Sequence, residues 1–222
     1  MPIDGLSIVL VGGAGGLGSA TAELLAADGA DVIISSRSHG IQADITKASD
    51  RARLLDSVTA LYGLVVFAGN PARGNMEETM RLSHELNYQG PILLAREAAE
   101  RMKAAGTHGA IVLFSTMQAV ALFPGSTVYA GEKAALLHAA RILAKECRGA
   151  ANIRVNVIAP GVMAAGMAEP SIAAGKYNRY LDEGVIPRFG KAIDVARAVR
   201  FLVEPDNYIT GQALSVDGGI TL

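Results

Sequence analysis

Short apolar runs recur along the chain and alternate with longer segments in which apolar residues return at helical spacing. The runs are apolar throughout rather than at every second position, which is typical of strands buried on both faces of a sheet. Strands that alternate with helices predict an α/β fold, a parallel sheet with helices on both faces. The expected strands are 7–13, 31–36, 63–69, 110–115, 153–161 and 213–219, and the expected helices are 17–28, 50–60, 76–105, 128–148 and 191–203.

The same pattern continues over all 222 residues without a repeat, a low-complexity tract or a linker, so we expect one domain over 1–222. The least regular part is 162–188, which is rich in Ala, Gly and Met and has Pro170 and Pro187 near its ends. We expect it to form a loop or short helices over a substrate site.

Composition narrows the possible partners. Hydrophobic residues make up 50% of the chain, and the net charge of −1 gives no reason to expect nucleic acid or an anionic membrane as a partner. The single cysteine, Cys147, excludes an internal disulfide and fits a reducing, cytoplasmic location. No apolar run of about 20 residues is present, and the first apolar stretch lacks the basic flank of a signal peptide. The four histidines show no metal-ligand spacing, so we expect no metal site.

The glycine-rich stretch "VGGAGGLG" at 11–18 follows the first strand and opens the first helix. Glycines allow a tight turn and a close approach of backbone to phosphate, while the helix N-terminus offers free N–H groups. The stretch predicts dinucleotide binding, with a purely structural turn as the alternative. Two spacings fit: Gly13, Gly15 and Gly18, or Gly12, Gly16 and Gly18.

The end of the second strand bears on the choice of cofactor. An NAD-binding fold usually places an acid there to bind the ribose 2′-hydroxyl. This chain has Ser36 followed by Arg37, and a guanidinium beside a hydroxyl suits a 2′-phosphate. We therefore expect NADP rather than NAD, although NAD stays possible, and a solvated loop arginine is the alternative reading.

Tyr129 and Lys133 lie four positions apart at the start of an apolar helix, and so on the same face. A nearby cation lowers the pKa of a phenol from about 10, and a shift of three units requires roughly 4 kcal/mol. The spacing predicts an acid–base tyrosine whose pKa is lowered by Lys133. The alternative is a chance pair on a solvated turn.

With both features in place, the chain resembles the short-chain dehydrogenase/reductase family over nearly its whole length. The segments that carry the resemblance are "VGGAGGLG", "ADIT", "FAGN", "ELNYQGP", "YAGEK", "NVIAPG" and "TGQALSVDGG". The resemblance implies a Rossmann-like doubly wound sheet and selects the second glycine spacing. The cofactor contacts expected from it, together with Ser36 and Arg37, are Gly12, Gly16, Leu17, Gly18, Asp44, Ile45, Ala68, Gly69, Tyr129, Lys133, Pro160, Gly161 and Val162.

The resemblance also implies catalytic roles. Tyr129 would be the acid–base group, and Lys133 would also hold the nicotinamide ribose. Asn87 would connect Lys133 to solvent through a water relay. The family's catalytic serine lies thirteen residues before the tyrosine, a position that Thr116 occupies here, with Ser115 just before it. Neighbouring side chains on a strand point to opposite faces, so we expect Thr116, rather than Ser115, to hold the substrate oxygen.

Several positions depart from the family pattern. The connection from Ser36 to Asp44 is very short and leaves little or no helix between the second and third strands. Other family residues are replaced by Val11, Val66, Phe67, Thr116 and Ala165.

Taken together, these patterns predict an NADP-preferring reductase of a small carbonyl or secondary alcohol substrate. A cofactor-binding sensor or scaffold without turnover is one alternative, and a non-redox lyase or isomerase that uses Tyr129 is another. Long helices rich in Ala and Leu, such as "KAALLHAARILA", predict a homo-oligomer, a tetramer or a dimer. Apolar and aromatic residues of the irregular segment either line a substrate pocket or serve packing alone: Met163, Met167, Tyr177 and Tyr180.

Overall fold

The computed structural model of the protein describes residues 2–71 and 76–222. Over these residues the strands form one parallel sheet of seven, in the order β3-β2-β1-β4-β5-β6-β7. The predicted α/β fold with a doubly wound parallel sheet is thus confirmed. The strands are β1 (Ser7–Val11), β2 (Asp31–Ser36), β3 (Ile41–Gln42), β4 (Leu61–Val66), β5 (Ala110–Phe114), β6 (Arg154–Pro160) and β7 (Ala213–Val216).

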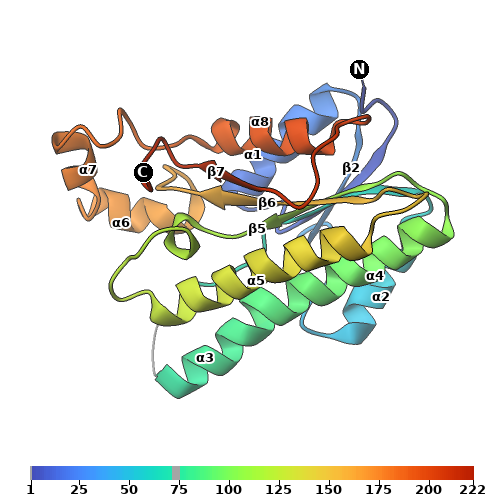
Figure 1. Ribbon diagram of the computed structural model, residues 1–222, viewed down its shortest axis with the longest axis horizontal. Coiled ribbons are helices and arrows are strands. Elements are labelled where there is room, and N and C mark those ends of the chain that lie inside the picture. The colour runs from blue at the N-terminus through green and yellow to red at the C-terminus, as the bar shows by residue number, and fades with distance from the viewer. Residues whose placement is uncertain (1, 72–75) are drawn as a thin grey trace.

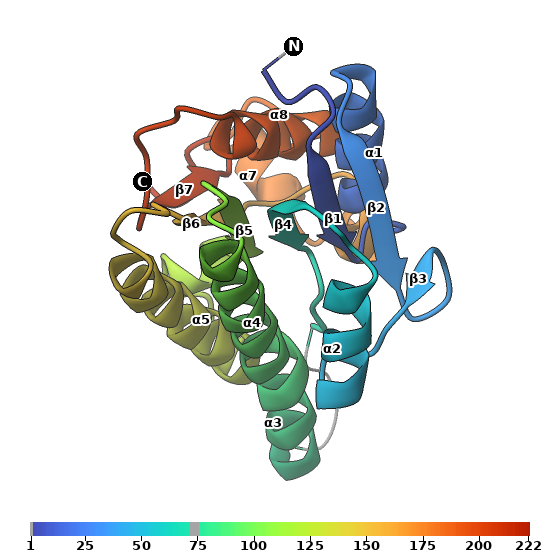
Figure 2. The same ribbon diagram turned by 90° about the vertical axis from the view of Figure 1, so that its right-hand side faces the viewer.

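Helices cover both faces of the sheet (Figures 1 and 2). On one face, α1 packs against α8, and α2, α4 and α5 lie on the other. The helices are α1 (Gly16–Ala27), α2 (Ala48–Asp56), α3 (Met76–His84), α4 (Gly90–Ala104), α5 (Thr127–Glu146), α6 (Glu169–Ala173), α7 (Asn178–Asp182) and α8 (Ala192–Val203), with a π turn at Glu85–Gln89 and 3₁₀ turns at Met117–Ala119 and Gly166–Ala168.

The core follows from the two-residue period of the strands. In β1, Ile8 and Leu10 belong to the cluster under α1 and α8, whereas Val9 and Val11 belong to the cluster under α2, α4 and α5. All four are nearly or fully buried. Uninterrupted apolar strands are therefore required because both faces of the sheet are covered.

The connection between β2 and β3 is shortened, as predicted, and contains no helix. The sequence did not predict β3 itself, because two residues are too few for a period. Gly40 closes the turn at φ +66°, in the left-handed region, and the Ser35 hydroxyl donates a hydrogen bond of 2.8 Å to the Ile41 carbonyl. A local turn here replaces the helical crossover that parallel strands usually need.

The prediction of one continuous helix over 76–105 is wrong at its centre. The π turn Glu85–Gln89 separates α3 from α4. Such a turn adds a residue to the helical repeat, which apolar spacing alone does not reveal. Its buried member is Asn87, which is fully enclosed.

The irregular segment 162–188 forms short helices, among them α6 and α7, as expected. They lie beyond the carboxyl end of β6 (Figure 1). None of the helices described is both long and apolar enough to cross a membrane. Homo-oligomer formation stays a prediction. It is consistent with an exposed face of α5 that carries Ala134, Ala135 and Ile142.

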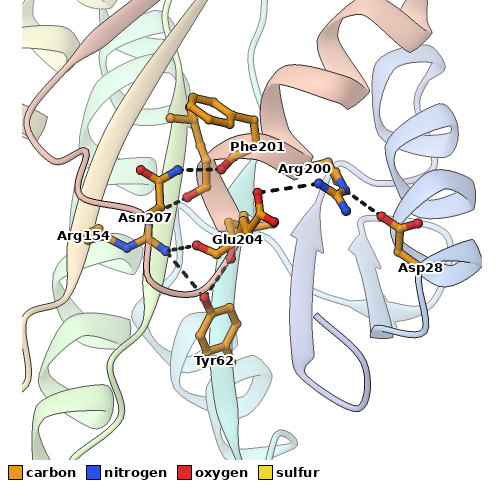
Figure 3. A network of polar contacts seen from close by, with 9 residues as sticks. Asp28, Tyr62, Arg154, Arg200, Phe201, Glu204 and Asn207 are labelled. Carbon is orange, nitrogen blue, oxygen red and sulfur yellow. Dashed lines mark hydrogen bonds and ion pairs between the residues drawn. The ribbon is translucent and has the colours of Figure 1, made fainter. Parts of the chain in front are cut away.

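A buried arginine, Arg154, secures the end of the sheet at which β6 begins (Figure 3). Arg154, at the start of β6, is 4% exposed, and its guanidinium donates to the carbonyls of Leu202 at 2.6 Å and Glu204 at 3.0 Å. The Tyr62 hydroxyl donates to the carbonyl of Val203 at 2.7 Å. In the described part of the chain, Arg154 has no carboxylate at ion-pair distance, so its charge is balanced by the carbonyl end of α8.

A second arginine lies beside this network. Arg200 joins Asp28, just after α1, at 2.6 Å and Glu204 at 3.6 Å, which links the ends of α1 and α8 (Figure 3). Asn207 donates to the Phe201 carbonyl at 2.6 Å. Arg154, Tyr62 and Asn207 thus donate to three carbonyls in the last turn of α8, those of Leu202, Val203 and Phe201.

We predict that Arg154→Met lowers the free energy of unfolding by about 2–4 kcal/mol, because buried carbonyls of α8 lose their donors at about 1–3 kcal/mol each. Urea denaturation followed by circular dichroism measures the change. Arg197→Met, on the exposed side of α8, is the matched control and should stay within about 0.5 kcal/mol. An equal effect of both variants would contradict this role for Arg154.

Candidate active site

A cavity opens at the carboxyl ends of β1 and β4, which are neighbours in the sheet. From β1 the strand order continues outward through β2 and β3, and from β4 it continues the other way through β5, β6 and β7. In open α/β sheets this is where ligands bind. The cavity has a volume of about 1160 Å³, above the roughly 300–1,000 Å³ usual for small-molecule sites, and so has room for a dinucleotide and a second molecule. Every residue predicted for the site lines this cavity except Asn87.

The glycine turn between β1 and α1 is shaped to receive a phosphate group. Gly12 has φ +81°, and a Cβ on Gly18 would lie 2.5 Å from the Gly12 carbonyl oxygen, so both positions require glycine. The helix α1 begins without a side-chain cap at Gly15. Its first N–H groups and its positive dipole end are therefore available to an anion. The turn, Leu17 included, fits the pyrophosphate of a dinucleotide.

The segment after β6 lies against this turn. Pro160, Gly161 and Val162 line the cavity, and Val162 is buried. Gly16 of the glycine turn lies close to the residues after Val162: a Cβ on Gly16 would be 3.0 Å from the backbone nitrogen of Gly166. The glycine turn and the irregular segment thus meet in the wall of one cavity.

The turn after β2 forms the wall next to the glycine turn. The Ser36 hydroxyl accepts from the backbone nitrogens of Ser38 at 3.2 Å and His39 at 2.7 Å and donates to the His39 carbonyl at 3.0 Å. The capacity of this hydroxyl is thus used within the turn itself. Arg37 is the charged side chain that the turn presents to the cavity.

Asp44 and Ile45 continue this wall beyond β3. One carboxylate oxygen of Asp44 accepts from the backbone nitrogen of Thr46 at 3.1 Å and from its hydroxyl at 2.8 Å. Ile45 is buried, and its carbonyl accepts from the Arg51 guanidinium at 2.9 Å. Both predicted residues are therefore held in fixed positions by local hydrogen bonds.

The two hydroxyls at the end of β5 have different partners. Ser115 donates to the main-chain carbonyl of Lys133 at 2.9 Å, inside the protein. Thr116 lines the cavity together with Tyr129, and its side chain acts to lower the pKa of that phenol. Alternation at the strand end therefore turns Thr116, and not Ser115, toward the phenol.

Lys133 is 2% exposed and donates from Nζ to the Phe114 carbonyl at 2.8 Å. It lies beside Gly69, where a Cβ would be 3.4 Å from Nζ, and Ala68 precedes this glycine in the cavity wall. The ammonium group is thus enclosed between the ends of β4 and β5.

Burial dominates the acid–base properties of the pair. It raises the pKa of Tyr129 to about 12, and the Thr116 side chain lowers this only in part. Burial also lowers the pKa of Lys133 to about 8. Desolvation of the phenolate is the dominant cause, and Lys133 does not contribute to this shift, so a lowering of the Tyr129 pKa by Lys133 stays a prediction. The phenol is protonated at neutral pH, as a proton donor must be.

Asn87 lies behind the cavity. Its amide oxygen accepts from the backbone nitrogen of Asn70 at 2.8 Å, and its amide nitrogen donates to the Asn70 carbonyl and the Ser83 hydroxyl, each at 2.9 Å. A Cβ on Gly69 would lie 3.2 Å from the amide oxygen and 3.4 Å from Lys133 Nζ. The structure therefore places both Asn87 and Lys133 next to Gly69.

The cavity also contains charged residues that the sequence did not single out. Lys176 and Arg179 line it from the irregular segment, each next to a tyrosine that the sequence did single out. The available signal was the repeated pairing of a cation with a tyrosine, although spacing alone does not show which side chains face a cavity. Met163, Met167, Tyr177 and Tyr180 line it as well. No cluster of three or more potential metal ligands occurs among the described residues.

Comparison with known proteins agrees with this architecture. The sequence model of the family described as enoyl-(acyl carrier protein) reductase matches residues 36–221. Carbonyl reductase family member 4 of Danio rerio is 33% identical over 243 residues, which cover 96% of this chain and 97% of the relative. Human dehydrogenase/reductase SDR family member 4 is 31% identical, over 92% of this chain and 83% of its own.

A solved structure has the same fold. The short-chain type dehydrogenase/reductase from Mycobacterium ulcerans superposes with a TM-score of 0.89 at 29% identity, covering 100% of this chain and 91% of its own. The chain belongs to the short-chain dehydrogenase/reductase family of oxidoreductases.

Proposed function

We propose that the protein is an NADP-dependent reductase of a carbonyl group in a small molecule. The observation that carries the proposal is that the Thr116 hydroxyl and the Tyr129 phenol line the same cavity as the glycine turn. Two hydroxyls that face the same space can bind one carbonyl oxygen together. The name of the Danio rerio relative, a carbonyl reductase, supports this substrate class.

The bound nicotinamide cofactor would supply the hydride. The residues of the chain handle the oxygen and the proton. Thr116 donates a hydrogen bond to the substrate oxygen as negative charge develops there, and Tyr129 transfers its proton to that oxygen. Tyr129 carries its proton throughout the neutral range, as a proton donor must, and its raised pKa makes it a weaker acid than a free phenol. Lys133 would hold the ribose of the cofactor, and Asn87 would connect Lys133 to solvent through a water relay.

Arg37 is the residue we propose to select NADP. It is the charged side chain on the turn after β2, and the position before it holds serine instead of an acid. Because the Ser36 hydroxyl is used by its own turn, the guanidinium is left to bind the 2′-phosphate.

The two alternatives are separated by one assay. NADPH consumption is followed by absorbance with a panel of ketones and with NADH in parallel. Stoichiometric consumption and formation of an alcohol support a reductase. Binding of NADPH without turnover on any ketone would favour a sensor, and proton transfer or elimination without consumption of NADPH would favour a lyase or isomerase.

We predict that Tyr129→Phe abolishes nearly all reduction while NADPH still binds, because the ring is kept and the proton is lost. Thr116→Ala should lower kcat roughly a hundredfold, the effect of losing one oxyanion donor. Thr116→Ser keeps the hydroxyl and should be tolerated. Steady-state kinetics and fluorescence titration of NADPH measure both effects.

Ser115→Ala is the matched control, because the Ser115 hydroxyl contacts the Lys133 carbonyl and not Tyr129. It should reduce the rate less than Thr116→Ala. The assignment of Thr116 is wrong if Ser115→Ala is the more damaging change. The whole mechanism is wrong if Tyr129→Phe leaves the rate intact.

For the cofactor, we predict that Arg37→Ala weakens NADPH binding by roughly ten- to a hundredfold, the contribution of a charge-assisted hydrogen bond, and leaves NADH nearly unchanged. Arg148→Ala, an exposed arginine near the end of α5, is the control. Titrations with both cofactors measure the preference. Equal affinity of the native protein for NADPH and NADH would show that Arg37 does not select the phosphate.

The lowered pKa of Lys133 predicts a pH dependence. Lys133 is charged below its pKa of about 8 and neutral above it, so kcat/KM for reduction and the affinity for NADPH should fall as pH rises through this value. Lys133→Arg keeps its charge and should shift any residual alkaline limb upward. Profiles between pH 6 and 10 test this, and rates and affinities that stay constant to pH 10 would contradict it.

A further inference from the structure

We propose that Lys176 and Arg179 bind an anionic group of the substrate, a carboxylate or a phosphate, at a position away from the reacting carbonyl. The inference rests on the proposed reductase function and adds the chemical class of its substrate. It rests on the excess of positive charge in the cavity wall and on the contacts of the two cations with neighbouring tyrosines.

The cavity is strongly unbalanced in charge. Among the described residues that line it, Arg37, Lys133, Lys176 and Arg179 are basic, and Asp44 is the one acid. Asp44 lies at the β3 end, beyond the turn that carries Arg37. The wall formed by the irregular segment therefore presents cations to the cavity without a carboxylate.

Neither cation has an ion-pair partner in the described part of the chain. Lys176 Nζ lies 5.6 Å from the ring centroid of Tyr177, within the range of a cation–π contact. The Arg179 guanidinium lies 4.7 Å from the Tyr180 ring and donates 2.8 Å to its hydroxyl. Glu183 acts on Arg179 through its charge only and does not line the cavity.

The two tyrosines place these cations close to the catalytic end. Tyr177 and Tyr180 are partly buried against the cluster that contains Met117 and Val162. Met117 directly follows Thr116, which we propose to hold the substrate oxygen. A substrate bound at Thr116 and extending along this wall therefore meets Lys176 and Arg179.

An anion is the ligand that this arrangement favours. Two unpaired cations on one wall attract a carboxylate or a phosphate, and an arginine fork matches the geometry of either group. Both cations are exposed, so screening by salt should weaken their effect. A neutral ketone gains nothing from them.

The test compares ketones of equal chain length that end in a carboxylate, a phosphate or a neutral carboxamide. We expect native kcat/KM to be roughly ten- to a hundredfold higher for the anionic ketones than for the carboxamide, the gain from hydrogen bonds to a charged group. The larger of the two gains identifies the group. Raising NaCl from 10 to 200 mM should reduce the ratio of anionic to neutral kcat/KM.

The decisive variant is Lys176→Gln combined with Arg179→Gln. It should bring the ratio of anionic to neutral kcat/KM close to one, whereas the control pair Lys145→Gln and Arg197→Gln, outside the cavity, should keep the native ratio. A ratio near one in the native protein, or a native ratio in the double variant, would overturn the inference.

The outcome can be separated from that of the proposed function. If no ketone is reduced, calorimetric titration of the keto acid into native protein and the double variant decides the inference alone. Binding that the double variant loses supports the anion site even where the reductase proposal fails. Equal binding, or none to either protein, would reject the site.

Discussion

The site depends on the buried contact between α5 and the end of β5. Lys133 donates to the Phe114 carbonyl, and Ser115 donates back to the Lys133 carbonyl, so two consecutive strand-end residues hold one helical residue at two points. Neither contact can be lost without leaving a buried polar group unpaired. Together they fix the rotation of α5 about its axis. Tyr129, one turn earlier on the same face, therefore meets Thr116 at the cavity wall.

The strands other than β3, the parallel sheet with helices on both faces and the glycine turn could be predicted from the sequence, because apolar runs, their alternation with helices and glycine spacing are visible there. Apolar runs such as 7–11 are buried on both faces, and Gly12 and Gly18 are required by the backbone itself. The π turn at Glu85–Gln89 could not be predicted, since it is stabilised by contacts between Asn87 and Asn70 seventeen residues away. β3 could not be predicted either, because its two residues are too few to show an apolar period and their position depends on the turn after β2.

The pKa values in the site could not be predicted from the sequence for a related reason. Spacing placed Tyr129 and Lys133 on one face, but pKa values follow from the solvent that the whole fold removes, and that removal keeps both groups closer to neutrality. The hydroxyl of Ser36 is another example. Its chemistry suits a phosphate ligand, yet the backbone of its own turn uses it. Side-chain type shows what a residue can do, and the fold determines what it is free to do.

The position of Arg154 has a consequence for how such a chain can diverge. The Arg154 guanidinium lies at the amino-terminal end of the parallel strands, whereas the cavity opens at their carboxyl-terminal end. The residues that hold the C-terminus of α8 are thus separated in space from those that line the cavity. The loops around the cavity can be shortened, as after β2, or exchanged during evolution without disturbing the contacts between Arg154 and α8. A new specificity can arise on the same fold because changes around the cavity leave the contacts at the other end of the sheet intact.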